Sequence, residues 1–532
     1  MADSQEKTPE FGRLRSLIWP IHRHELKKLI PMLLIFFFIT FNYNVLRTMK
    51  DTLVVTAESS GAEVIPFIKV WFMFPGSVLM AFLFTRLSNR FSQETVFHSI
   101  VALFIAFFVL FTFVLYPNRD YLHPNELCDR LQATLPLGLR GLIAAFRNWT
   151  FTLFYVMSEV WGNIVLSLLM WGFVNQVTRL GEASRFYTLF GVGINSSGII
   201  AGYLSVKMSQ VAFNPNLPFG ETAWEQSMLL LIGTVVIVGV VIMGLFRWLN
   251  CYVVKAETAD DGSGEKGEPK DVRGRISMRD SFRYLFKSKY LTNLAIIVIT
   301  YNIVINLVEV VWKHQVKTLY PNQQDYNLYM SYITMIMGMA ATFTSMFLAG
   351  NLVRRLGWSF TAMLTPVILF STSILFFGAI LANMFYPELL YSMTGVAPLA
   401  VVVFLGSLQN ILSRSAKYTV FDETREMALI PLSAECKLKG KAVIDGVCSR
   451  LGKSTGAFAH QSLLIVFSSI AISIPYVTGI LFSVIGLWMF VTRQLGKEFN
   501  DLTANSKDGI LSSSNGEEKA EDVNVELQEQ PA

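Results

Sequence analysis

Residues 29–48 read LIPMLLIFFFITFNYNVLRT, and this stretch decides the structural class of the protein. It holds no charged side chain before Arg47, and a helix needs about 20 mostly apolar residues to cross the hydrocarbon layer of a membrane. We therefore predict a membrane-spanning helix here. Residues 1–28 are polar and basic, and they lack the short apolar core and small-residue cleavage site of a secretory signal. We expect the first helix to remain in the membrane.

The composition of the whole chain agrees with this class. Hydrophobic residues make up 52% of the 532 residues and charged residues only 16%, whereas soluble domains carry about 25% charged residues. The four cysteines have neither disulfide nor metal-ligand spacing. The sequence offers no Ser/His/Asp set and no metal-ligand cluster. We therefore expect a membrane protein that is not an enzyme, with no bound metal, cofactor or nucleic acid.

Twelve apolar runs of spanning length divide into two sets of six. The first set covers residues 29–48, 64–85, 96–116, 149–177, 186–208 and 227–248. The second set covers residues 290–312, 326–350, 358–383, 390–413, 441–467 and 470–492, of which 441–467 is the least apolar. The predicted organisation is therefore an N-terminal segment (1–28), two six-helix bundles (29–248 and 290–492), a polar linker (249–289) and a disordered polar tail (493–532).

Basic residues in short loops predict the orientation, because Lys and Arg are retained on the cytoplasmic side. The loops after the second, fourth, eighth and tenth predicted spans are basic, and the last of them begins with Arg414 and Lys417. We therefore expect both termini to be cytoplasmic. The loop at 116–149 is an exception, since it holds four arginines on the predicted outer side, and we expect part of it to form an interfacial helix.

The two sets of spans show internal similarity. Ile39-Thr40-Phe41-Asn42 matches Ile299-Thr300-Tyr301-Asn302 at an offset of about 260 residues, and Asn195-Ser196-Ser197-Gly198 matches Lys453-Ser454-Thr455-Gly456 at nearly the same offset. Six-span halves of the same orientation indicate parallel repeats, as in major facilitator transporters, whose substrates bind between the halves near mid-membrane. The predicted fold is an all-α integral membrane protein with twelve transmembrane helices in two parallel six-helix repeats.

Ionisable residues inside the first four spans are candidates for function, because each costs about 2.5 to 3.5 kcal/mol to insert. Arg47 and Lys50 are three residues apart and share a helix face. Both lie near a span end, so extension of their side chains to the membrane surface is an alternative. Glu159 is too short to reach that surface, and Asn163 follows it by one turn.

The seventh span carries a polar stripe. Asn302, Asn306, Glu309 and Lys313 follow one another at spacings of four, three and four residues, which places them along one helix face. This pattern predicts a face that lines water or a ligand. The alternative is an intrahelical pair of Glu309 and Lys313 that satisfies only itself.

The eleventh span is the most polar and includes Lys441, Asp445, Arg450 and Lys453. Such a helix has to line water or a charged ligand. Taken over all spans, cations outnumber carboxylates, and the fork of Arg and the flexible chain of Lys suit phosphate oxygens. Amide side chains, among which we count Asn195, are suited to bind a base or sugar. The residues therefore predict an organic phosphate as the ligand.

Four strings within these spans resemble a known family. RTMKDTLVVT at Arg47–Thr56, SEVWG at Ser158–Gly162, INLVEVVWK at Ile305–Lys313 and KGKAVID at Lys439–Asp445 are similar to the ATP/ADP translocases of obligate intracellular bacteria and plastids, and most of all to chlamydial members. The resemblance covers all twelve predicted spans and leaves out the linker and the tail.

This resemblance implies a carrier in a bacterial inner membrane, and we expect it to be a monomer. The resemblance also implies exchange of external ATP for internal ADP by alternating access, often with phosphate accompanying ADP, which supplies the bacterium with energy from its host. The family's important charges match Lys50, Glu159, Glu309 and Lys453, with Lys441 as the alternative to the last.

Two other functions remain open from the sequence. The first is a proton-coupled importer of several nucleotides or of NAD, which belongs to the same class of protein. The second is a membrane enzyme or sensor that binds an anion, which belongs to a different class.

Overall fold

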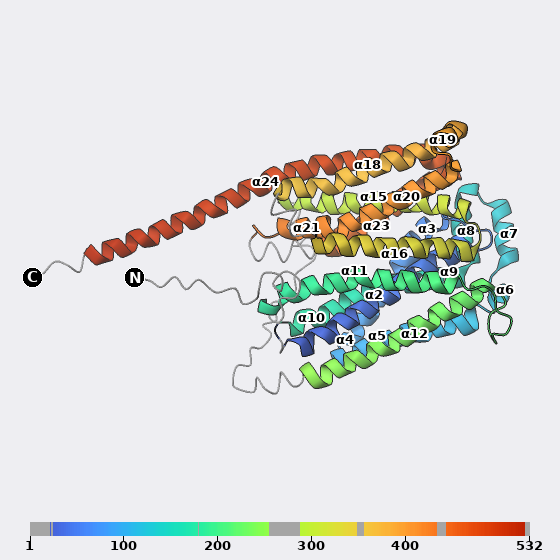
Figure 1. Ribbon diagram of the computed structural model, residues 1–532, viewed down its shortest axis with the longest axis horizontal. Helices are drawn as coiled ribbons and strands as arrows, with labels where there is room; N and C mark the ends of the chain where they lie inside the picture. Colours follow the sequence, from blue (N-terminus) through green and yellow to red (C-terminus); the bar gives the residue numbers. More distant parts are fainter. Residues whose placement is uncertain are drawn as a thin grey trace, which may run out of the picture. The chain divides into compact units, whose positions relative to one another are not determined.

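The computed structural model describes residues 22, 25–178, 180–254, 288–347, 356–432 and 443–526. Every regular element within these ranges is a helix (Figure 1). Eleven helical segments in this part of the chain are long and apolar enough to cross a membrane. These findings confirm the predicted all-α membrane class. The twelfth predicted span, at 441–467, is occupied by the helix α23 (Ser449–Phe467), which is not among the eleven.

The N-terminal half of the chain forms six long helical segments, several of which include π-helical turns. They are α2 (Leu26–Val55), α3 (Val64–Phe67) with η1 (Ile68–Met73) and α4 (Phe74–Ser88), α5 (Gln93–Leu110) with η2 (Phe111–Leu115), α9 (Trp149–Trp161) with η4 (Gly162–Met170) and α10 (Trp171–Val177), α11 (Leu180–Ser209), and α12 (Ala223–Leu249) with η5 (Asn250–Val254). The loop before α9 contains α6 (Arg119–Leu122), α7 (Asn125–Thr134), η3 (Leu137–Leu139) and α8 (Arg140–Arg147).

The described C-terminal half continues in the same way. Its helices are α15 (Lys289–Leu319), α16 (Gln323–Phe347), α18 (Trp358–Phe385), α19 (Pro387–Thr394), α20 (Pro398–Ala416) with η6 (Lys417–Phe421) and α21 (Asp422–Ala428), η7 (Ile444–Cys448) with α23, and α24 (Ile470–Glu526). The long helix α24 continues well past residue 492, where the last predicted span ends.

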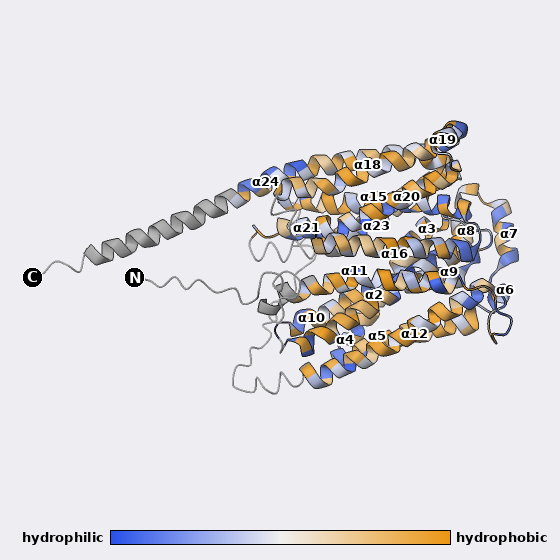
Figure 2. Ribbon diagram, viewed as in Figure 1, coloured by the Kyte–Doolittle hydropathy of each residue, from blue (hydrophilic) through white to orange (hydrophobic). Residues whose placement is uncertain are grey.

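Hydrophobic residues predominate along the long helices, whereas hydrophilic residues gather at helix ends and along α7 (Figure 2). The large apolar side chains of Phe74, Leu79 and Phe82 on α4 are exposed. A long helix with an apolar outer surface is expected where lipid replaces water as the solvent.

Contacts between residues divide the chain into two compact units. Unit 1 comprises Met1–Gly267 and Val316–Thr342, and unit 2 comprises Glu268–Gln315 and Phe343–Ala532. The end of α15 and most of α16 therefore group with the N-terminal helices. This grouping follows from helix contacts that no local sequence pattern reveals.

The core of unit 1 is built around α2, which contacts α9, α11 and α12. The apolar side chains of Ile35, Phe36 and Ile39 on α2 are fully buried. The indole nitrogen of Trp161 donates a hydrogen bond to the Ile39 carbonyl oxygen at 3.0 Å, and Asn42 Nδ2 donates to the Val235 carbonyl oxygen at 2.9 Å. These bonds satisfy polar groups that lipid could not.

Glycines bring α11 and α16 into close contact within unit 1. A Cβ atom added to Gly202 would lie 2.5 Å from the backbone nitrogen of Met335, and one added to Gly338 would lie 2.7 Å from that of Ile199. Thr52 of α2 also donates to Asn327 Oδ1 of α16 at 3.1 Å. Small residues at such contacts let helix backbones approach closely in a membrane.

Candidate functional site

Two of the predicted charges of unit 1, Lys50 and Glu159, meet in its interior. The Lys50 side chain is only 2% exposed, and its Nζ lies 2.9 Å from Asp51 Oδ1 and 3.0 Å from Glu159 Oε1 of α9. The same Nζ lies 3.8 Å from the ring centroid of Tyr155, one turn before Glu159. The Lys50 ammonium group therefore ends in the interior of the unit and does not extend to the membrane surface.

Three further predicted residues of unit 1 are half-buried. Arg47 lies one turn before Lys50 on α2 and has no ion pair with a residue that the structure describes. Asn163 lies at the start of the π-helical segment η4, and such segments are frequent at functional sites. Gly162 precedes it, where a Cβ atom would lie 2.9 Å from the ring of Tyr43 on α2. Asn195 lies on α11 and is half-buried.

A second charged cluster lies in unit 2 around Glu309 of α15. Glu309 Oε1 accepts hydrogen bonds from Lys313 Nζ at 2.9 Å and from Arg414 Nη2 at 3.3 Å. The alternative given above, an intrahelical pair of Glu309 and Lys313, is therefore present, but Arg414 also belongs to the cluster. One carboxylate serves two cations, so these three side chains together carry a net charge of +1.

Arg414 is the residue that sequence analysis missed. We expected it in the loop after the tenth span, but α20 continues to Ala416 and keeps Arg414 on a helix, with its side chain 15% exposed. The repeat gave only a partial signal, since Ser413-Arg414 lies 255 residues after Ser158-Glu159 and so falls five residues short of the offset of about 260. The charge of Arg414 instead resembled the basic residues of cytoplasmic loops.

Asn302 and Asn306 lie where α15 meets α23 in unit 2. Each side-chain Nδ2 donates at 2.8 Å to the carbonyl oxygen four residues earlier on α15. A Cβ atom added to Gly452 would lie 2.8 Å from Asn302 Cβ, and one added to Gly456 would lie 3.0 Å from Asn306 Cβ. Both asparagines are buried in this helix contact.

The predicted cations of the eleventh span are only partly described. Arg450 and Lys453 lie on α23 with exposed side chains. Lys441 lies outside the described residues, and so does the side chain of Asp445, whose backbone belongs to η7. The structure thus brings Lys50 together with Glu159 and adds Arg414 to Glu309.

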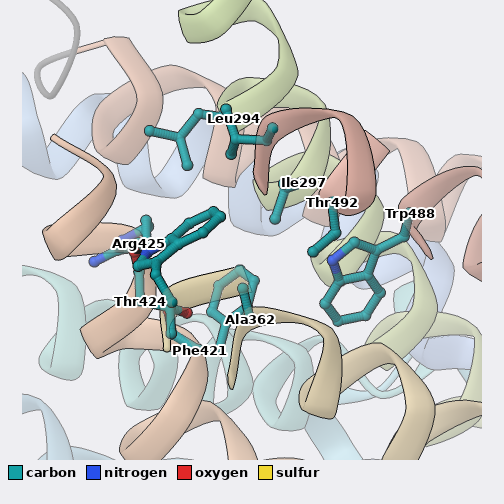
Figure 3. A pocket seen from close by; sticks show the side chains of 10 residues that line it. Leu294, Ile297, Ala362, Phe421, Thr424, Arg425, Trp488 and Thr492 are labelled. Carbon is teal, nitrogen blue, oxygen red and sulfur yellow. Dashed lines mark hydrogen bonds between the residues drawn. The ribbon is translucent and has the colours of Figure 1, made fainter. Parts of the chain in front are cut away.

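A small crevice in unit 2 contains none of these residues (Figure 3). Trp358, Phe421, Trp488 and Arg425 are among the side chains that line it, and the Trp358 indole nitrogen donates to the Thr424 carbonyl oxygen at 2.9 Å. Its cavity volume of about 10 Å³ is no more than the roughly 10 to 15 Å³ that a single water molecule needs. We therefore do not assign a ligand to it.

Comparison with solved structures identifies the fold. A D-xylose-proton symporter aligns with 89% of this chain and 97% of its own at 13% identity, with a TM-score of 0.53. The inward-open xylose transporter XylE from E. coli aligns with 86% of this chain and 94% of its own at 12% identity, with a TM-score of 0.51. At such identities the likeness concerns the fold alone, and it confirms the predicted arrangement of major facilitator type.

Curated relatives match along nearly the whole chain. ADP,ATP carrier protein 1 of Chlamydia pneumoniae is 44% identical over 499 residues, which are 94% of this chain and 96% of that protein. The chloroplastic ADP,ATP carrier protein 1 of Arabidopsis thaliana is 41% identical over 483 residues, which are 91% of this chain and 75% of that protein. The model of the TLC ATP/ADP transporter family matches residues 4–499. This chain is therefore a multi-pass membrane protein that belongs to the TLC ATP/ADP transporter family.

Proposed function

We propose that this protein is an antiporter that exchanges ATP for ADP across a bacterial inner membrane. The observation that carries the proposal is its 44% identity to a chlamydial ADP,ATP carrier over almost the full length of both chains. The buried charges support it independently. Each charge in a membrane helix costs about 2.5 to 3.5 kcal/mol, and the cluster around Glu309, with two cations to one carboxylate, fits a carrier of an anion.

In this proposal cationic side chains bind the phosphate chain of the nucleotide. Lys50, Arg47, Arg450 and Lys453 supply point charges and planar forks suited to phosphate oxygens. Lys441 is the alternative to Lys453. The amides of Asn163 and Asn195 are suited to hydrogen bonds with adenine or ribose, and Tyr155 offers an aromatic face. Asn302 and Asn306 on α15 and Asp445 on η7 complete the set of residues that we propose bind the substrate.

Exchange by alternating access follows from the same charges. With no nucleotide bound, Glu159 and Glu309 balance part of the positive charge. The remaining surplus makes it costly to exclude water from the empty carrier. A bound nucleotide neutralises that surplus, so the loaded carrier changes state more readily than the empty one. Return without a substrate is then slow, and import of one nucleotide requires export of another.

The direction and charge balance also belong to the proposal. ATP carries about one negative charge more than ADP, so exchange alone moves charge across the membrane. Export of phosphate together with ADP lowers this imbalance. The carrier imports ATP from a host cell, works as a monomer in the lipid bilayer, and has both termini in the cytoplasm. It performs no chemical conversion of its substrate.

The test is uptake of radiolabelled ATP into proteoliposomes preloaded with ADP, with empty vesicles and vesicles containing other nucleotides as controls. We expect strong uptake only where internal ADP is present. Equal uptake into empty vesicles would overturn exchange and point to a proton-coupled importer. Recovery of a converted nucleotide would point to an enzyme.

A further inference from the structure

We propose that Arg414 binds the phosphate chain of the transported nucleotide and that Glu309 occupies its place in the unloaded carrier. This inference rests on the proposed function and names a residue that the family resemblance did not supply. It starts from the contact between Arg414 Nη2 on α20 and Glu309 Oε1 on α15.

The two cations of the cluster are held differently. Lys313 lies one turn after Glu309 on the same helix, is 1% exposed and approaches Oε1 to 2.9 Å. Arg414 comes from another helix, is 15% exposed and makes a longer contact of 3.3 Å through one nitrogen. A guanidinium group can hold two anionic oxygens side by side. Lys313 is therefore the fixed partner of Glu309, and Arg414 is the partner that can be exchanged.

Local packing holds the backbone of Arg414 in position. A Cβ atom added to Gly406 would lie 2.6 Å from both the Phe376 and Trp312 rings, so α20 packs closely against α15 and α18. The Trp312 indole nitrogen donates to Ser407 Oγ at 3.1 Å across the same contact. The Arg414 side chain can therefore change its partner while its helix stays in place, which is the arrangement expected of a preorganised binding residue.

Charge balance makes the exchange of partners possible. The three side chains carry a net charge of +1 while Arg414 contacts Glu309. When a phosphate group takes Arg414, Glu309 still has Lys313 as a counter-ion. No buried carboxylate is then left without a cation, and so the penalty of an uncompensated buried charge does not arise. If the cluster had only one cation, transfer of that cation from Glu309 to a phosphate group would leave the carboxylate without a counter-ion.

The test compares Arg414→Gln with Glu309→Gln by equilibrium binding of radiolabelled ATP to the purified full-length protein, with inorganic tripolyphosphate as competitor. Loss of one charge-assisted contact is expected to weaken binding of both compounds about tenfold in Arg414→Gln. Glu309→Gln removes the carboxylate that competes with phosphate for Arg414, so it is expected to strengthen ATP binding. ATP binding is thus expected to weaken in one variant and to strengthen in the other. If the ion pair only stabilised the structure, both substitutions would change ATP binding in the same direction.

Arg425→Gln is the matched control. Arg425 lies in α21, near the end of the same helical segment as Arg414, and forms ion pairs with Asp422 and Glu426. We expect its binding constants to stay within about twofold of the wild type. Arg414→Lys keeps the positive charge but loses the planar fork, so it is expected to bind ATP more weakly than the wild type and more tightly than Arg414→Gln. If Arg414→Gln does not fold, Arg414→Lys is compared with the wild type in its place.

Unchanged binding in Arg414→Gln, or equal weakening in Arg414→Gln and Glu309→Gln, would overturn the assignment. Because binding is measured without transport, its result is separate from that of the exchange assay. A wild-type protein that exchanges ATP for ADP while Arg414→Gln binds normally would refute this inference and leave the proposed function intact.

Discussion

Arg414 and Glu309 join α20 to α15 at 3.3 Å, and Glu159 and Lys50 join α9 to α2 at 3.0 Å with the charges reversed. In both halves of the chain a buried ion pair thus fastens the first span to the fourth. At the repeat offset of about 260 residues, Glu309 falls within one residue of the position equivalent to Lys50. Arg414 lies five residues from the position equivalent to Glu159, so the two halves carry ion pairs of opposite sign between corresponding spans.

The first prediction concerns Lys50. Replacing it with methionine leaves Asp51 and Glu159 without the cation they share at 2.9 and 3.0 Å. Breaking a buried pair in this way costs about 3 to 5 kcal/mol. We expect Lys50→Met to melt at a clearly lower temperature and to lose at least about nine-tenths of ATP/ADP exchange.

The double variant Lys50→Met/Glu159→Gln separates these two effects. It neutralises Glu159 as well as removing the lysine, so only Asp51 loses its cation. Part of the thermal stability should therefore return, while ATP/ADP exchange stays low. Thermal unfolding of the purified proteins and uptake into vesicles provide the two measurements. Wild-type exchange in Lys50→Met would show that this lysine takes no part in transport.

The second prediction concerns the contact between α11 and α16. Gly338→Ala places a Cβ atom 2.7 Å from a backbone nitrogen of α11, which cannot move aside as a side chain can. We expect a lower melting temperature and slower exchange. Gly378→Ala on α18 is the control, because a Cβ atom there meets nothing within 4 Å and alanine favours a helix. If Gly338→Ala and Gly378→Ala had the same melting temperature and exchange rate, the close contact between α11 and α16 would not be needed for stability or transport.

Particular residues show what the sequence could and could not predict. Apolar runs located the spans, and the cost of burying a short carboxylate singled out Glu159 and Glu309 without any structure. Arg414 escaped because a long basic side chain near a span end has the same pattern as a loop residue at the membrane surface. The partner of Lys50 could not be derived either, since contacts between helices depend on packing over more than 100 residues of chain.

The same limit applies to two of the predicted amides. The stripe of Asn302 and Asn306 indicated a polar face on α15. The helix that packs against this face is α23, which contacts it through Gly452 and Gly456, about 150 residues later in the chain. Helical periodicity shows which residues share a helix face, but it does not show which other helix packs against that face.

The third prediction concerns pH and His123, which lies in the loop before α9. Burial, assisted by Arg119, lowers the pKa of this imidazole against the opposing effect of Asp120. One ring nitrogen, Nε2, lies 2.7 Å from Thr150 Oγ1. Because the folded protein holds the neutral form, stability is complete above the ordinary pKa of about 6.5 and declines as the pH falls below it.

The measurement is the melting temperature of the purified protein between pH 7.5 and pH 5. We expect the wild type to lose more thermal stability over this range than His123→Asn, which has no titrating ring. Asparagine is the control substitution because it keeps a polar group that can bond to Thr150. Identical pH profiles for the two proteins would rule out a contribution from His123.

The last prediction decides between Lys453 and Lys441 in the eleventh span. Lys453 follows Gly452, whose close contact with Ile299 and Asn302 fixes that turn of α23 against α15. A lysine on an anchored turn presents its charge at a defined place, so we expect Lys453→Gln to raise the half-saturation concentration for ATP about tenfold. The effect on ADP should be smaller, because ADP carries less negative charge. Lys441→Gln should change the half-saturation concentrations for ATP and for ADP by less than about twofold. Half-saturation concentrations in ADP-loaded vesicles measure this difference, and a larger effect at Lys441 would transfer the phosphate contact to that residue.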